Sequence, residues 1–184
     1  MNLKKILKIS GIVLGGIILL LITVGGIAYY NYVEKYPQDK NKYPHYIGHI
    51  SPETSVLNDN FMLCDNENIY GTHHGKPKVA FHISKKHFRE TILSEYDNTK
   101  YTDSGYLDFR FLVNCEGQAG RFEINELNLD LEKTNLNDMM VNDLLKLTAN
   151  EKHWNVFYAK ELPRNYYMYI LYRIENGKIT EILP

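Results

Sequence analysis

Residues 108–123, DFRFLVNCEGQAGRFE, decide the fold, because they encode a strand, a tight turn and a second strand in continuous sequence. Apolar and polar side chains alternate through the first half, as on a strand with one face in a core. The apolar face carries Leu107, Phe109, Phe111, Val113 and Cys115, and the other face carries Asp108, Arg110 and Asn114. Leu112 is the apolar residue that falls out of phase. Gly117 and Gly120 bracket the reversal, since glycine adopts the positive φ of tight turns without steric cost, and the alternation resumes at Phe122 and Ile124.

An uncharged apolar stretch, ISGIVLGGIILLLITVGGIAYY, occupies residues 9–30. Its length of about 22 residues is enough to cross a hydrocarbon core of roughly 30 Å as a helix. Lysines precede it at positions 4, 5 and 8, and positive charge before a span favours an N-terminus in the cytoplasm. The sequence therefore predicts a cytoplasmic basic N-terminus at residues 1–8, a transmembrane anchor at 9–30, and a C-terminal part on the far side of the membrane.

Two alternatives concern this apolar stretch. Gly26-Ile27-Ala28 is an acceptable cleavage site for a signal peptide, but the stretch is longer than the roughly 7 to 15 residues of a signal core, which favours an uncleaved anchor. Gly11 and Gly15 form a GxxxG pair that lets two membrane helices approach closely. Glycine is also frequent in membrane helices that do not pair. A homodimer through this pair and a single unpaired helix are therefore both open.

The chain contains two cysteines, Cys64 and Cys115. Outside the cytoplasm, thiols are oxidised rather than kept reduced. A bridge between them closes a loop of about 50 residues and stabilises the folded state by about 4 kcal/mol in the chain-entropy model. We therefore expect a Cys64–Cys115 disulfide, with two separately buried thiols as the alternative.

The part after the anchor divides into a tether and a folded domain. Residues 31–50 are polar and contain Pro37 and Pro44, which is typical of a juxtamembrane tether. Residues 51–184 then form the domain. Their apolar patterns predict helices over 84–95, capped by Ser84, and over 137–149, capped by Asn135 or Asn137. Strands are expected over 166–174 and 179–183, joined by an Asn-Gly turn within residues 175–178.

The expected fold class is α+β: an antiparallel sheet of roughly three to four strands with two helices on one face, preceded by the transmembrane helix. Trp154 follows the second helix, and we expect its large apolar side chain to close the core under the sheet. Pro163 is expected to end the connection that contains it. The formal net charge of -1 gives no support for nucleic acid as a partner.

No catalytic or cofactor-binding motif is present in the sequence. It contains no GxSxG, phosphate loop, HExxH or dinucleotide fingerprint. The histidines at 73, 74, 82 and 87 do not have the spacing of a closed metal site and are interpreted as solvated loop residues. We therefore expect neither an enzyme nor a cofactor or metal. A Cys115 nucleophile paired with a histidine is the remote catalytic alternative.

The F-x-V-N-x-x-G motif at residues 111–117, the later Trp154 and the closing tyrosine-rich strand resemble the TonB C-terminal domain. The resemblance covers residues 104–184, and residues 51–103 more loosely. It implies a single-pass inner-membrane protein of a Gram-negative envelope, with its C-terminal domain in the periplasm. It also implies contact with outer-membrane receptors, or other envelope partners, by strand addition to a sheet edge, in energy-coupled transport.

The edge-strand hypothesis names six residues for partner contact: Tyr167, Tyr169, Leu171, Ile179, Glu181 and Leu183. Ordinary sheet packing is the competing explanation for the same residues. The membrane span contains no histidine, and the tether is short, whereas energy transducers of the family carry a membrane-embedded histidine and a long proline-rich spacer. The alternative function is therefore a membrane-tethered periplasmic interaction domain without energy coupling.

Overall fold

The computed structural model describes residues 3–31, 50–64, 69–72 and 80–183. The chain divides into two compact units, residues 1–44 and 45–184. The first unit contains helix α1 (Leu3–Tyr29). Within α1, the 21 residues Ile9–Tyr29 have a mean hydropathy of 2.5, and none of this segment is buried inside the protein. By length and composition α1 can therefore span a membrane, as the sequence predicts for residues 9–30.

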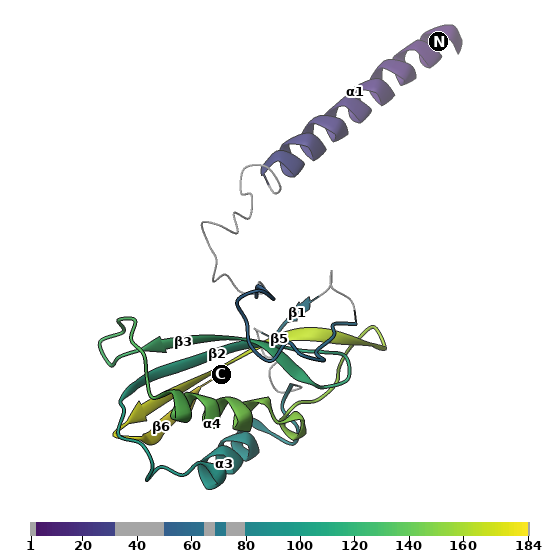
Figure 1. The fold of residues 1–184 in the computed structure, drawn as a ribbon. Helices are drawn as coiled ribbons and strands as arrows, with labels where there is room; N and C mark the ends of the chain where they lie inside the picture. Colours follow the sequence, from purple (N-terminus) through teal and green to yellow (C-terminus); the bar gives the residue numbers. More distant parts are fainter. Residues whose placement is uncertain (1–2, 32–49, 65–68, 73–79, 184) are drawn as a thin grey trace. The chain divides into compact units, whose positions relative to one another are not determined.

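The second unit is built on a mixed sheet of six strands (Figure 1). They are β1 (Ile69–Gly71), β2 (Gly105–Val113), β3 (Ala119–Leu127), β4 (Phe157–Ala159), β5 (Leu162–Glu175) and β6 (Lys178–Leu183). The sheet follows the order β1-β5-β2-β3, and β4 and β6 also pair with β5. β2 lies between β3 and β5 and is antiparallel to both. The hairpin predicted from residues 108–123 is therefore confirmed, with β2 inside the sheet and β3 at the end of the strand order.

The sheet differs from the expected one in two respects. It contains six strands rather than three or four, and β1 pairs with β5 in parallel, so the sheet is not wholly antiparallel. The added strands, β1 and β4, have three residues each, too few for an alternating pattern to reveal them. Pro163 does not end a connection: it lies in β5 opposite Tyr158 of β4, near the start of the strand, where proline is tolerated.

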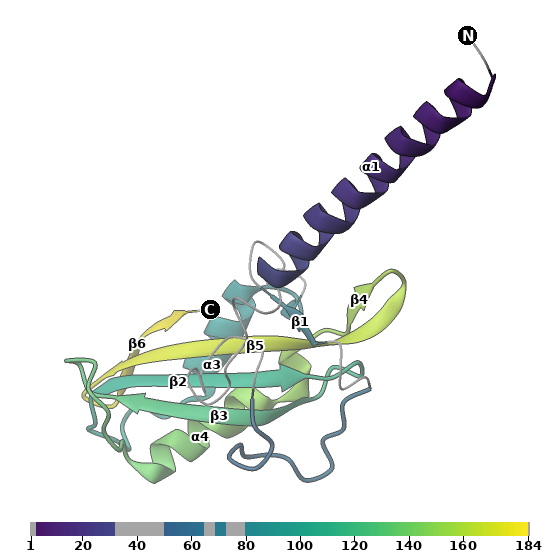
Figure 2. The same ribbon diagram turned by 90° about the horizontal axis from the view of Figure 1, so that it is seen from above.

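Helices α3 (Lys85–Glu95) and α4 (Asp138–Ala149) lie together on one face of the sheet (Figures 1 and 2). The Ser84 side chain caps α3 by accepting a hydrogen bond from the His87 backbone N–H. Asn137 caps α4 in the same way, accepting from the N–H groups of Met139 and Met140. Both caps satisfy backbone donors that a helix start leaves free, and both helices begin and end within a residue of the predicted bounds. A short 3-10 helix, η2 (Glu151–His153), follows α4.

Trp154 closes the main core between the sheet and these helices, as predicted. It is 4% exposed, and its ring centroid lies 5.3, 5.5 and 5.0 Å from those of Phe81, Phe88 and Phe111. Its indole N–H donates to the Thr148 carbonyl at 2.9 Å, so the polar end of the side chain is satisfied. The core face of β2 consists of Leu107, Phe109, Phe111 and Val113, each fully buried.

Leu112, the apolar residue that breaks the alternation of β2, is buried on the helix-free face of the sheet. There it forms a second, smaller cluster with Ile50 and Tyr167. The pairing of β2 with β3 shifts register between Arg110 and Leu112. Ile50 is buried, so the folded unit includes the last residue of the predicted tether, while residues 32–49 lie outside the described residues.

Candidate functional site

The outer edge of β6 is the candidate site for partner contact. β2 occupies one edge of β5, so β1 and β6 share the other: β1 pairs with residues 165–167 and β6 with residues 171–175. Within the part of the chain that the structure describes, β6 pairs with β5 alone. Its second edge therefore presents backbone N–H and C=O groups that another extended chain can bind.

A groove of about 260 Å³ runs between this edge and helix α3. It is lined by Arg89 and Leu93 of α3 and by residues 179–183 of β6. Leu93 and Leu183 are 53% and 43% exposed. The Nε atom of Arg89 is buried without a hydrogen-bond partner among the described residues. The groove thus combines a strand edge with exposed apolar side chains, which are the features that strand addition uses.

The six residues predicted for partner contact do not share one surface. Tyr167 is 2% exposed and Tyr169 is 37% exposed, and both belong to the face of β5 opposite the helices. Leu171 lies opposite Leu183 in the β5–β6 pairing, so these two share that face with Glu181, which lies opposite Arg173. Ile179 lies opposite Ile174 and packs against the main core instead. The structure brings Ile179, Glu181 and Leu183 into the groove.

The helix-free face carries a buried polar cluster that the sequence pattern did not reveal. Arg110 is 6% exposed, donates through Nε to the Tyr167 hydroxyl at 2.7 Å, and pairs with Glu123 at 3.2 Å. Burial raises the pKa of Asp108, which accepts a hydrogen bond from Asn125. The alternation of β2 suggested a solvated polar face, whereas long-range neighbours cover it.

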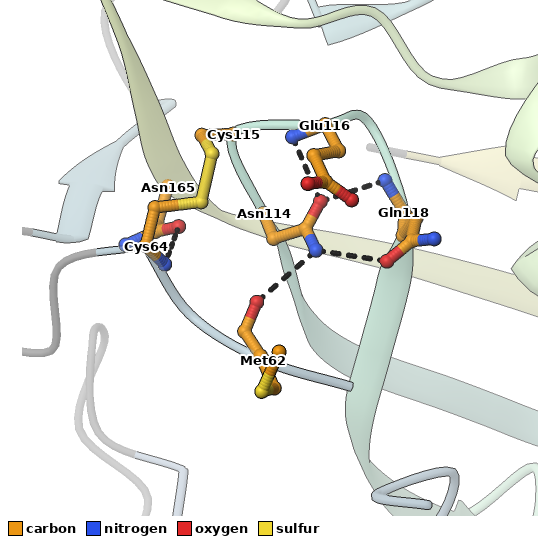
Figure 3. The surroundings of a disulfide bond; sticks show 7 residues. All are labelled: Met62, Cys64, Asn114, Cys115, Glu116, Gln118 and Asn165. Carbon is orange, nitrogen blue, oxygen red and sulfur yellow. Dashed lines mark hydrogen bonds between the residues drawn. A yellow bond between two sulfur atoms is a disulfide. The ribbon is translucent and has the colours of Figure 1, made fainter. Parts of the chain in front are cut away.

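Cys64 and Cys115 form a disulfide, as expected from the sequence, with their Cα atoms 6.1 Å apart (Figure 3). Cys115 lies in the turn between β2 and β3, and Cys64 is exposed to solvent. The Asn165 side chain accepts a hydrogen bond from the Cys64 backbone N–H at 3.2 Å. Asn114 holds the turn beside them: its Oδ1 accepts from the N–H groups of Glu116 and Gln118.

The segment 50–64, called the strap from here on, is fastened to the sheet by this disulfide. Val56 forms reciprocal backbone hydrogen bonds of 2.9 Å with Phe122 of β3. Phe61 and Leu63 pack against the Leu112–Tyr167 cluster on the helix-free face. Asn114 donates to the Met62 carbonyl at 3.1 Å. In the sequence, Cys64 was the only indication that this segment lies against the sheet, because the strap has no periodic pattern of apolar residues.

The described histidines form no metal site. Within residues 50–64, 69–72 and 80–183, no cluster of three or more His, Cys, Asp or Glu side chains is arranged to hold a metal ion. His82 and His87 line a cavity of about 500 Å³ with His153. His153 is 6% exposed, its Nε2 atom is buried without a partner among the described residues, and burial lowers its pKa. His73 and His74 lie outside the described residues.

No protein-family model, no curated protein and no solved structure matches this chain. Support for a function therefore comes from the residues and geometry described above.

Proposed function

We propose that the chain is a single-pass membrane protein whose folded domain binds a protein partner along the open edge of β6. The apolar segment Ile9–Tyr29 supplies the anchor. The Cys64–Cys115 disulfide supports a domain on the extracytoplasmic side, because disulfides persist in oxidising compartments. In a Gram-negative cell this compartment is the periplasm and the anchor lies in the inner membrane.

The groove beside β6 is the observation that carries this proposal. A partner segment in extended conformation forms backbone hydrogen bonds with the open edge, and these supply affinity with little dependence on sequence. Side chains on one face of that segment contact Leu93 and those on its other face contact Leu183, and the apolar surface of both leucines is exposed in the free protein. Such a partner segment is extended and carries apolar side chains.

The TonB-like interpretation is the narrower form of the proposal, in which the partner is an outer-membrane receptor or another component of energy-coupled transport. It is supported by residues 111–117, which form the end of β2 and its turn, and by Trp154 in the core beneath them. The broader form is a tethered interaction domain without energy coupling. It is supported by the histidine-free span and by the short segment, residues 32–49, between α1 and the strap.

Site-specific photocrosslinking in cells tests the proposal. A crosslinking residue replaces Thr180 or Leu183 in the full-length protein, and Tyr158, which is 62% exposed on β4, serves as the control position. We expect both β6 positions to capture the same discrete protein and Tyr158 not to capture it. Equal capture from Tyr158, or none from β6, would contradict the proposal. Recovery of an outer-membrane receptor favours the transport form, and recovery of inner-membrane or periplasmic proteins favours the broader form.

A further inference from the structure

The strap covers parts of the sheet that would otherwise be open to solvent. Its Val56 takes the place of a neighbouring strand at the outer edge of β3, through two hydrogen bonds to Phe122, and the Leu57 carbonyl accepts from the Arg121 N–H at 3.3 Å. Further along, Phe61 covers Gly120 so closely that a Cβ atom there would collide with the ring. The strap therefore covers both an edge and a face of the sheet.

Non-covalent packing of the strap is shallow. Ile50 is its only buried residue. Val56, Leu57 and Met62 are 42%, 45% and 76% exposed. Segments with few buried apolar contacts open locally at a small cost in free energy, well below that of global unfolding. The covalent bond at Cys64 is thus the strongest constraint on the C-terminal end of the strap.

This bond is accessible to a reductant. Cys64 is exposed, and Cys115 is partly exposed in the β2–β3 turn. Exposed disulfides are the labile and regulatory ones, in contrast to those enclosed in a core. The main core does not contain either sulfur: its residues lie between the sheet and helices α3 and α4.

We propose that the Cys64–Cys115 disulfide is a redox latch that holds the strap on the sheet, and that its reduction releases the strap and uncovers a surface of the sheet. The surface consists of the β3 edge at Phe122 and the apolar side chains of Leu112 and Tyr167. Leu112 and Tyr167 are 1% and 2% exposed with the strap in place, where Phe61 and Leu63 of the strap pack on them together with Ile69 of β1. The latch does not depend on whether β6 binds a partner.

The reaction is a dithiol–disulfide exchange. A thiolate of an external dithiol reductant attacks one sulfur, forms a mixed disulfide with it and releases the other cysteine as a thiolate, which takes up a proton. The second thiol of the reductant then attacks the mixed disulfide. Cys64 and Cys115 end as thiols, having gained two electrons and two protons in total, and the reductant ends as a disulfide.

Hydrogen–deuterium exchange of the full-length protein in detergent micelles tests the latch, with and without dithiothreitol as the reductant. We expect reduction to accelerate amide exchange by about tenfold or more in the strap and at Arg121 and Phe122. Exchange in α4 should accelerate only as far as the loss of cross-link stabilisation lowers global stability, and its amides should stay far better protected than those of the strap, because that helix belongs to the main core. The Cys64→Ser/Cys115→Ser double variant should show the fast pattern under both conditions.

Three results would overturn the latch. Unchanged strap exchange after complete reduction would mean that packing alone holds the strap. Exchange of the strap and α4 at the same rate after reduction would mean that the two open together, so that the disulfide stabilises the whole fold rather than one segment. Failure of dithiothreitol to reduce the bond in the folded protein would show that the sulfurs are inaccessible. The oxidised protein alone, crosslinked from β6, tests the proposed function separately, so the two can fail independently.

Discussion

Asn114 illustrates how one buried side chain can fix a turn. Its Oδ1 accepts two backbone hydrogen bonds within the turn, and its Nδ2 donates to the Met62 carbonyl and the Gln118 side chain. Asn128 makes the same backbone pattern at the next turn, accepting from residues two and four positions later. The two differ in burial: Asn114 is 2% exposed, whereas the hydrogen bonds of Asn128 are exposed to solvent.

We expect Asn114→Ala to lower the free energy of unfolding by about 2 kcal/mol, because it leaves three partly buried backbone groups without their partners. Asn128→Ala is the matched control, and its cost should be below about 1 kcal/mol, since water replaces the lost bonds. Urea denaturation of the full-length protein in micelles measures both. Equal costs would show that burial at the β2–β3 turn does not matter.

His153 makes the stability depend on pH. Burial lowers its pKa below the ordinary value, so the folded state favours the neutral imidazole and the unfolded state binds more protons. The contribution of His153 to the free energy of unfolding is fully present above the pKa of its imidazole in the unfolded chain, about 6.5. It is lost as the pH falls below that value. Two residues of α3 also act on this pKa: the charge of Glu95 raises it and that of His87 lowers it. The ring also packs edge-on against Phe88 at 5.0 Å.

The test compares His153→Phe with the native protein. The variant keeps an aromatic ring beside Phe88 but does not titrate. Between about pH 7.5 and pH 5, the native protein should lose more stability than the variant in urea denaturation. The other histidines are common to both proteins, so their contributions cancel. Parallel pH profiles would show that His153 is not the responsible group.

At the residue scale, the sequence predicted the core better than the polar positions. Phe109, Phe111 and Val113 lie in the core because strand alternation depends on local geometry alone. Arg110 was expected on a polar face, yet it is buried by Tyr167 and Glu123. These partners lie 57 and 13 positions away along the chain, and no local pattern encodes such contacts.

At the scale of elements, the long helices and strands were predictable from the sequence and the short strands were not. Helices α3 and α4, with 11 and 12 residues, are long enough to carry both a cap and a repeating apolar face. β1 and β4 are too short to show a pattern in the sequence, and they are recognised as strands only by their backbone pairing with β5 in the structure. Part of the groove beside β6 was predictable. Ile179, Glu181 and Leu183 belong to a strand that the preceding Asn-Gly turn predicts. Arg89 and Leu93 join it only through the packing of α3.

The docking of the strap as an element depends on the contact between Phe61 and Gly120. We expect Gly120→Ala to displace the Phe61 ring, because the new Cβ has no room beside it, and to accelerate amide exchange in the strap. The loss of global stability should stay within about 1 to 2 kcal/mol. Phe61→Ala should remove the conflict, so the double variant should be no less stable than Phe61→Ala alone. A further loss in the double variant would show that Gly120 is needed for the strand itself.

At the scale of the whole molecule, an apolar helix and a disulfide-bridged α+β unit share one chain. The helix was evident from hydropathy, since Ile9–Tyr29 contains no charged residue. The disulfide, likewise expected from two cysteines, connects positions 51 residues apart. The strap it fastens was not evident, because it owes its position to the sheet beneath it. We propose that the partner binds the surface that remains open with the strap in place: the edge of β6 and the groove beside α3.

Capture of the partner by a photocrosslinker at Thr180, compared in cells between two variants, tests this claim most directly. Leu93→Asp places a charge in the groove, whereas Met139→Asp places one on α4 at a position that is 67% exposed and outside the groove. We expect Leu93→Asp to reduce capture by about tenfold or more, as for an interface residue of central importance, and Met139→Asp to leave it unchanged. Undiminished capture in a folded Leu93→Asp variant would contradict the account.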